Sequence, residues 1–313
     1  MGTTLLDCVE AATCAPSVHN SQPWLFRISD TGVEVHADPD RRLTVVDPYG
    51  REQRISLGAA VFTLRLAMRR AGHRTSVTLF PDRRRPELVA RVTVTGAQPP
   101  PPASEALAAA IVHRHTNRWP FAHIPVGPKV TDRLRDAARR EGAVLLTAGP
   151  RSRDMVLELA RSADKWLRER PEYQAELTRW SAGRGRRDGV PAWAAGPWDS
   201  LEVVPTREFT DFSPPARPVE PFEPYPAVLV LATEGDAQED WVRAGQALQR
   251  VLLTATWQNL ATMPISQPVE VPVVRRLLTD DESGLAAQIV LRVGYGRTVG
   301  RTPRRPVTDV LLA

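Results

Sequence analysis

The chain contains 313 residues but only two cysteines, Cys8 and Cys14. Two cysteines cannot build the disulfide framework of a small secreted domain, and their spacing is not that of a metal site. We therefore expect two buried free thiols in a reducing compartment.

Long apolar runs are absent as well. No stretch approaches the about 18 consecutive apolar residues that a membrane-spanning helix needs. The first residues, MGTTLLDCVEAATCAP, have neither the basic start nor the apolar core of a secretory signal. No membrane association is expected, and the predicted localisation is cytoplasmic.

Lysine is scarce. Only Lys129 and Lys165 occur, so nearly all of the 41 basic residues are arginines. The 36 acidic residues are interspersed with them, as in TDRLRDAARREG (131–142), and the net charge is only +5. No basic stripe with interleaved aromatic residues occurs, so nucleic-acid binding is not expected. A compact anion such as a phosphate is the better candidate ligand where particular arginines converge.

The apolar content is sufficient for a large core, because 42% of the residues are hydrophobic and 25% are charged. The residue pattern predicts the following elements in the first part of the chain: a helix over 3–14, a β-hairpin over 25–38, a long apolar helix over 51–72 that ends at Gly72, and strands over 76–80 and 87–96.

The segment AQPPPPASEA (97–106) predicts a stiff linker, and after it the order of elements recurs in outline. We expect helices over 104–112 and between 128 and 180, a strand over 227–232, a central helix over 237–261 and a closing strand over 286–294. The two central helices share a small-residue start and an apolar middle. The sequence therefore predicts an α+β fold with two degenerate halves, 1–96 and 107–313. Trp24 and Trp257 are both expected in the core.

Residues 180–226 are rich in glycine, proline, arginine and aromatic residues, and they lack sustained periodicity. So long an irregular segment in a compact protein is either disordered or functional. Its aromatic residues argue against disorder, because aromatic side chains favour burial. We expect an ordered lid over a site.

Two short motifs contain most of the candidate site residues. In HRHTNRWPF (113–121), the alternating Arg114, Thr116 and Arg118 would emerge on one face of an extended segment, which suits a phosphate dianion. A solvated arginine pair at a domain junction is the alternative. In APSVHNSQPWLF (15–26), a run of hydrogen-bonding side chains lies between two prolines, which suggests that something polar contacts it.

Several other kinds of site are excluded. His113 and His115 have no third ligand at supporting spacing, so no metal is expected. Ser17 and His19 lack a suitably placed acid, which argues against a hydrolase triad. No Gly-x-Gly-x-x-Gly joins a strand to a helix, and the glycine-rich VGYGRTVG (293–300) is interpreted as a turn.

Four separated segments resemble the nitroreductase family of flavoproteins. RHTNRWPF resembles its phosphate-binding signature, APSVHNSQPWLF its Pro-Ser-x-x-Asn-x-Gln-Pro-Trp stretch, ATMPISQ (261–267) its flavin-edge loop, and TPRRPVTDVL (302–311) its C-terminal Arg-x-Pro segment. Only the second motif lies before the linker. The chain therefore resembles a fused pseudo-dimer with one flavin site, which is the pattern of the actinobacterial Acg-type nitroreductase-like flavoproteins.

The resemblance implies a tightly but non-covalently bound FMN. Arg114, Thr116 and Arg118 would hold its phosphate, ribityl chain or pyrimidine edge, and His115 would pack beside it or face solvent. The remaining implied contacts are Arg304 and Arg305 around the phosphate, Pro16, Ser17, His19 and Asn20 against the isoalloxazine, and Pro264, Ser266 and Gln267 near N5. The family often has an acidic residue where Ser266 stands and glycine where Gln267 stands, so access for a hydride donor is an open question.

The implied activity is that of an FMN-dependent oxidoreductase, with ping-pong hydride transfer from NAD(P)H through flavin N5 to an unidentified small acceptor. No side chain is nominated as catalytic. Two alternatives remain open: a non-catalytic FMN-sequestering protein whose lid blocks the flavin, and a flavin-dependent dehydrogenase of a biosynthetic pathway. A monomer is compatible with the fused design, and a homodimer is not excluded.

Overall fold

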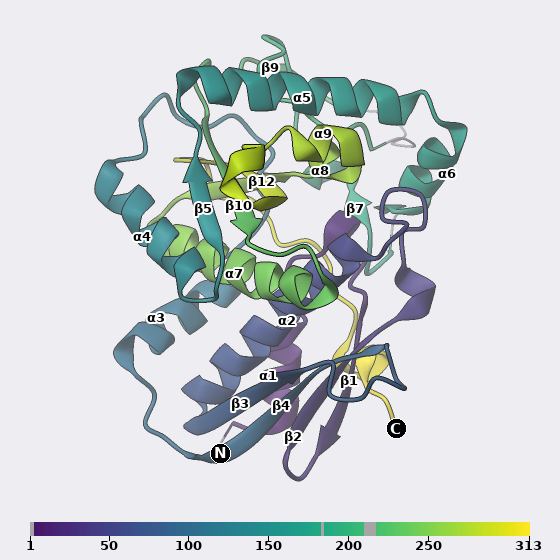
Figure 1. Cartoon of the computed structure of the whole chain (residues 1–313), viewed down its shortest axis with the longest axis vertical. Coiled ribbons are helices and arrows are strands. Elements are labelled where there is room, and N and C mark those ends of the chain that lie inside the picture. The colour runs from purple at the N-terminus through teal and green to yellow at the C-terminus, as the bar shows by residue number, and fades with distance from the viewer. Residues whose placement is uncertain (1–2, 183–184, 210–216) are drawn as a thin grey trace.

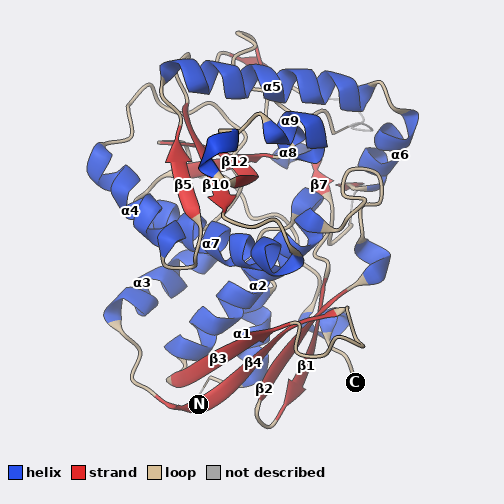
Figure 2. Cartoon of the chain, in the orientation of Figure 1, coloured by secondary structure: helices blue, strands red, loops and turns tan. Residues whose placement is uncertain are grey.

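The computed structural model describes residues 3–182, 185–209 and 217–313. Two four-stranded antiparallel sheets lie on opposite sides of a central pair of helices (Figures 1 and 2). The predicted α+β class is confirmed. The division into two degenerate halves joined by a linker over 97–106 stays a prediction.

The first sheet has the strand order β1-β2-β4-β3. Its first two strands form the predicted hairpin, in which Ser29 pairs with Gly32. The hairpin alternates apolar and polar residues, and its apolar face packs on the helices α1 and α2. The elements of this part are α1 (Leu5–Ala12), β1 (Trp24–Ser29), β2 (Gly32–Ala37), α2 (Arg51–Arg70), β3 (His73–Leu79) and β4 (Leu88–Ala97).

The central helices are α2 and α7 (Gln238–Trp257), and they pack against each other (Figure 1). They approach most closely at Gly58 and Gly245. A Cβ atom added at Gly58 would overlap the carbonyl oxygen of Val242 and lie 2.9 Å from the Gly245 Cα. The small-residue starts that the sequence analysis singled out are therefore the crossing point of the two helices. The helix α2 is apolar around most of its circumference because neighbours cover it on several sides.

The second sheet has the strand order β11-β12-β10-β5. Its inner strands β10 (Ala227–Thr233) and β12 (Ala286–Gly294) were predicted, and its outer strands β5 (Val144–Thr147) and β11 (Ala261–Ile265) were not. Both missed strands are short, and β11 contains Pro264, which reads as a strand breaker. An edge strand tolerates proline, because one side of its backbone needs no ladder hydrogen bonds.

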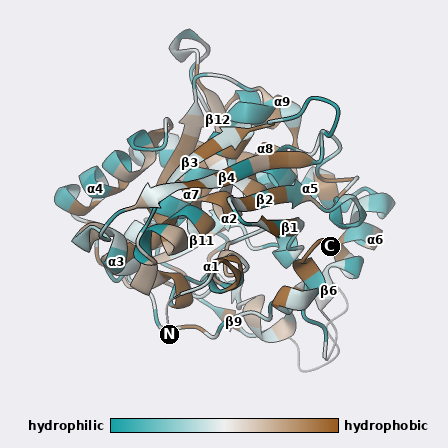
Figure 3. Cartoon of the chain, turned by 90° about the horizontal axis from the view of Figure 1, so that it is seen from below, coloured by the Kyte–Doolittle hydropathy of each residue, from teal (hydrophilic) through white to brown (hydrophobic). Residues whose placement is uncertain are grey.

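The remaining helices lie around these layers, and hydrophilic residues colour much of α4 and α6 at the periphery (Figure 3). Residues 98–101 connect β4 to α3. The helices of this group are α3 (Pro102–Ala109), α4 (Pro128–Arg139), α5 (Pro150–Arg168), α6 (Pro171–Arg179), α8 (Gln267–Glu270) and α9 (Pro272–Arg276).

In its described residues, the segment 180–226 contains two-residue strands and one 3-10 helix, Ala192–Ala194, and its Phe209 and Phe222 are buried. Residues 183–184 and 210–216 of the expected lid lie outside the described residues. The strands form two parallel pairs, β6 (Ser181–Ala182) with β7 (Val190–Pro191), and β8 (Trp198–Asp199) with β9 (Val219–Glu220).

Single-residue expectations have mixed outcomes. Trp24 is fully buried, and Cys8 and Cys14 are buried free thiols. The expectation for Trp257 was wrong, because this residue ends α7 and its side chain is 52% exposed. Among the residues that the structure describes, no helix is long and apolar enough to cross a membrane.

Candidate functional site

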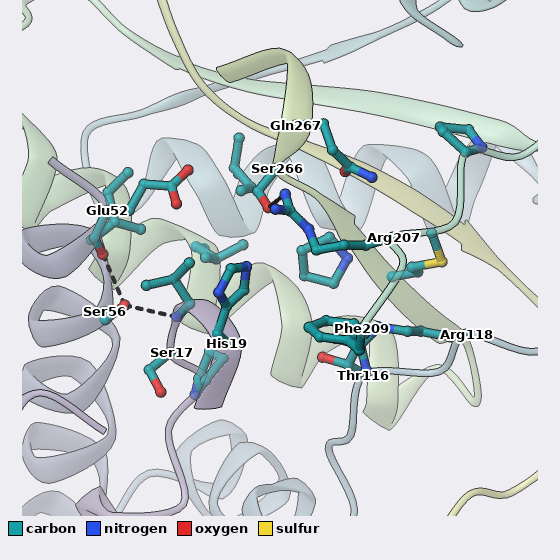
Figure 4. A pocket seen from close by; sticks show the side chains of 18 residues that line it. Ser17, His19, Glu52, Ser56, Thr116, Arg118, Arg207, Phe209, Ser266 and Gln267 are labelled. Carbon is teal, nitrogen blue, oxygen red and sulfur yellow. Dashed lines mark hydrogen bonds between the residues drawn. The ribbon is translucent and has the colours of Figure 1, made fainter. Parts of the chain in front are cut away.

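A cavity lies where the N-terminal segment meets the second sheet. Side chains from both parts of the chain face each other across it, as Figure 4 shows for His19 and Arg207. Eight of the residues predicted from the sequence line this cavity: Pro16, Ser17, His19, Thr116, Arg118, Pro264, Ser266 and Gln267.

A smaller cavity continues from the first one, with which it shares Pro16, Ser17, Thr116 and Arg118. Its other predicted lining residues are Asn20, Arg114 and Arg304. The two cavities together have a broad end, with apolar and aromatic side chains, and a narrow end with several guanidinium groups. This shape suits an elongated ligand with an anionic tail.

The edge strand β11 holds the arginine motif in place. Thr116 forms a parallel bridge with Thr262, and the backbone N–H of Asn117 donates to the Thr262 carbonyl at 2.9 Å. The backbone is therefore extended at Thr116. As the alternating spacing predicts, Arg114, Thr116 and Arg118 all line the narrow cavity.

The arginines of the narrow end have no acidic partner. Arg114 is buried, and its Nε has no hydrogen-bond partner. Among the described residues, no carboxylate forms an ion pair with Arg114, Arg118 or Arg304. Burial lowers the pKa of Arg114 to about 10, and burial together with Arg114 lowers the pKa of Arg304 to about 9. Uncompensated cations of this kind favour an anion in the cavity.

The polar run between Pro16 and Pro23 forms one wall of the site. Its residues His19, Asn20 and Gln22 have positive φ angles of 49°, 55° and 52°. Such φ angles are costly for residues other than glycine, and the surrounding hydrogen bonds hold them. The Asn20 amide donates to the Gly189 carbonyl at 2.9 Å and accepts from Arg304 Nη1 at 2.9 Å.

Gln22 lies in the same motif, but it was not among the predicted site residues. Its Nε2 donates to the Arg187 carbonyl at 2.8 Å, and its Oε1 accepts from the backbone N–H of Arg305 at 2.8 Å. Gln22 and Asn20 therefore connect the N-terminal wall to the 180–226 segment and to the C-terminal segment at once.

His19 lies at the centre of the broad cavity (Figure 4). Its ring meets the Phe209 ring edge-on, with 5.7 Å between the centroids, and neither ring nitrogen has a hydrogen-bond partner. Burial, with Arg207 and Arg118 nearby, lowers the pKa of His19 well below its ordinary value. The imidazole is therefore neutral and available to a ligand.

Arg207 was not predicted, although it lies on the cavity wall opposite His19. Its guanidinium donates to Glu270 Oε1 at 2.6 Å, to the Tyr173 hydroxyl at 2.5 Å and to Ser266 Oγ at 3.0 Å. This buried ion pair raises the pKa of Arg207 despite its burial. No local pattern marks Arg207, because its partner Glu270 lies 63 residues further along the chain.

Glu52 is the second residue that sequence reasoning missed. It lies in the first turn of α2, and its Oε2 is buried without a hydrogen-bond partner. Burial and the nearby Glu270 raise the pKa of Glu52 well above its ordinary value, although Arg51 Nη2 donates to its Oε1 at 3.1 Å. The broad cavity therefore has a carboxyl group with a raised pKa in its wall.

Two of the predicted residues line neither cavity. Arg305 turns to Asp38, with 3.3 Å between Nη1 and Oδ2, and its Nη2 donates to the Asp309 carbonyl. His115 is half-buried, and burial together with Arg114 lowers its pKa to about 4. Of these two consecutive arginines, Arg304 lines the site and Arg305 does not.

Comparison with known proteins identifies the class. The sequence model of the Nitroreductase family matches residues 133–296. The Mycobacterium tuberculosis protein named "Putative NAD(P)H nitroreductase Rv3131" is 34% identical over 98% of this chain and 91% of its own length. The chain belongs to the nitroreductase family.

Within this family, the chain is also similar to the M. tuberculosis protein named "Putative NAD(P)H nitroreductase acg", with 30% identity over 96% of this chain and 93% of that protein. The solved structures include a nitroreductase with bound FMN from Desulfitobacterium hafniense. It is 13% identical and has a TM-score of 0.41 over 66% of this chain and 97% of that one.

Proposed function

We propose that this protein is an FMN-dependent oxidoreductase that takes NAD(P)H as its reductant and reduces a small acceptor. The observation that carries the proposal is the cluster of uncompensated guanidinium groups at the narrow end of a continuous cavity. The names of the M. tuberculosis relatives, which describe NAD(P)H nitroreductases, support the choice of reductant.

The residues present fit FMN. Its phosphate dianion would satisfy the unpaired Arg114 Nε and offset the charge of Arg304. Its ring system would fill the broad end, which Pro16, Pro264 and Phe209 line. The chain holds no Gly-x-Gly-x-x-Gly loop for a dinucleotide pyrophosphate, which favours FMN over FAD.

When bound, FMN would supply the redox chemistry, accepting a hydride from NAD(P)H at N5 and passing it to the acceptor in a ping-pong cycle. The protein's own groups would position the flavin and form hydrogen bonds with its polar atoms. Arg118 lines both cavities, and burial and Arg207 lower its pKa to about 10. Its guanidinium would stabilise negative charge on a bound flavin. The neutral imidazole of His19, with one donor and one acceptor nitrogen, and the carboxyl group of Glu52 could each form a hydrogen bond in the broad cavity.

A second function, FMN sequestration, is favoured by the contacts of the 180–226 segment. Arg207 binds Glu270 and Tyr173, and Phe209 packs on His19, so this segment covers the broad cavity like a lid. A lid held by a buried ion pair would exclude an external hydride donor.

The single chain supplies both walls of the site, because Pro16, Ser17 and Asn20 line the same narrow cavity as Arg114, Thr116 and Arg118. This arrangement supports an intramolecular pseudo-dimer that is functional as a monomer. Gel filtration of the flavin-loaded protein tests the oligomeric state.

Anaerobic mixing with NADH or NADPH distinguishes the two functions. An enzyme loses its oxidised-flavin absorbance within seconds, whereas a store is reduced only by dithionite. Extraction and mass spectrometry of the bound cofactor test the premise that both share, and a chain purified without FMN that does not take it up would refute both.

A further inference from the structure

A third cavity adjoins the candidate site and shares Thr116 and Arg118 with it. Most of its remaining wall is formed by Trp119, Trp193 and the segment 297–300. The segment 297–300 belongs to VGYGRTVG, which was interpreted from the sequence as a turn and has no part in the proposed function.

This wall is held by specific packing. Gly296 pairs with Phe121 in an antiparallel bridge, and Asn117 Nδ2 donates to the Arg297 carbonyl at 2.8 Å. A Cβ atom at Gly296 would lie 2.8 Å from the Ala261 Cβ and 2.9 Å from the Phe121 ring, so glycine is needed for this close approach. The packing fixes Arg297 over Trp119.

The cavity combines aromatic faces with an uncommitted charge. The Arg297 guanidinium carbon lies 3.2 Å from the centroid of the Trp119 ring. Within the described part of the chain, the Arg297 side chain joins no ion pair and donates no hydrogen bond. Trp193 is 51% exposed, and a Cβ at Gly300 would contact its ring at 3.2 Å. The Arg297 guanidinium covers the Trp119 face, and the half-exposed Trp193 lines the same cavity. An accessible tryptophan ring and a guanidinium without an ion pair suit a planar base that carries a phosphate.

We propose that this third cavity binds the adenosine-phosphate half of NAD(P)H, with the adenine on Trp193 and a phosphate on Arg297. The inference rests on the proposed function, because the reductant carries a purine and phosphates at the end opposite its nicotinamide. The shared residues Thr116 and Arg118 place this cavity next to the cavity in which the nicotinamide must react.

Titration calorimetry of the flavin-loaded protein with 5′-AMP and 2′,5′-ADP tests the proposal, because neither ligand can reduce a flavin. We expect saturable binding of at least one of them, and a preference for 2′,5′-ADP would assign the site to NADPH. Arg297→Glu and Trp193→Ala should each weaken this binding about tenfold. Inorganic phosphate should bind more weakly than the preferred nucleotide.

A matched pair provides the control. Arg170 lies over the half-exposed Trp166, with 5.2 Å between the guanidinium carbon and the ring centroid, and neither residue lines the third cavity. Arg170→Glu and Trp166→Ala should leave nucleotide binding unchanged. The proposal is overturned if flavin-loaded protein binds neither nucleotide, if phosphate alone binds as tightly, or if the control variants lose as much. Failure of the proposed function would be seen separately, in the flavin content and its reduction.

Discussion

Two groups of buried arginine lie at opposite ends of the candidate site, and their surroundings differ. Arg207 has a carboxylate, a phenol and a hydroxyl within hydrogen-bond distance, and the ion pair raises its pKa. Arg114 and Arg304 contact backbone carbonyls, the Asn20 amide and the Thr302 hydroxyl but no carboxylate of the described residues, and burial lowers the pKa of each. A buried guanidinium that has a counterion stabilises the fold, whereas a buried guanidinium that lacks one favours the binding of an anion.

Removal of the partner of Arg207 gives the largest expected change. Glu270→Ala should lower the free energy of unfolding by about 3–5 kcal/mol, because a buried guanidinium loses its counterion. Urea denaturation measures this. The double variant Arg207→Met with Glu270→Leu should recover much of the loss, since apolar replacement of a whole pair is often tolerated. If Glu270→Ala were as stable as the wild type, the ion pair of Arg207 would not stabilise the fold, and its contrast with Arg114 would fail.

Arg114→Ala should affect cofactor binding and not the stability of the fold. We expect FMN affinity to fall by roughly 2–4 kcal/mol, about 30- to 1000-fold, with little loss of stability in the cofactor-free protein. Fluorescence titration of FMN measures the affinity. Arg304→Ala should behave similarly, and Arg305→Ala is the matched control, because Arg305 is paired with Asp38 outside both cavities. Stoichiometric FMN in purified Arg114→Ala would contradict this assignment.

The pH dependence of stability tests the neutral state of His19. Burial and the nearby Arg207 and Arg118 lower the pKa of this residue. Below its ordinary value of 6.5, the unfolded chain binds a proton at this residue that the folded chain does not. The free energy of unfolding should therefore fall with decreasing pH, by about 1.4 kcal/mol per pH unit from this group. Urea denaturation between pH 7.5 and 5 should show a smaller slope for His19→Leu. The exposed His123→Gln should keep the wild-type slope, and an unchanged slope in His19→Leu would mean that the imidazole is not held neutral.

The smallest effect is expected for a surface arginine. Arg139 and Asp136 form an ion pair at 2.7 Å, with side chains 80% and 55% exposed. Because water screens such a pair, Arg139→Ala should change the free energy of unfolding by less than about 1 kcal/mol. Denaturation under the conditions used for Glu270→Ala gives the direct contrast, and a comparable loss would show that burial does not separate the two classes.

Local pattern was sufficient for several elements. The hairpin around Asp30 to Gly32 follows from alternating residues and a turn, and α2 follows from its apolar circumference and Gly72, whose φ is 86°. The strand β11 was missed because Pro264 breaks its pattern, and only its place at the edge of the sheet makes the proline acceptable.

The order of residues along the chain by itself determined the α+β class, the two central helices and the positions of the arginine and Asn20 motifs, because these depend on neighbours within a few residues. Only the tertiary structure decided which buried arginines have a carboxylate partner and which do not. Arg304 lies in a motif that pointed to a site, whereas no pattern marked Arg207; in the folded chain Arg207 pairs with Glu270, and Arg304 lies near the like charge of Arg114. Charge compensation depends on groups that are distant in the chain, and folding alone brings them together.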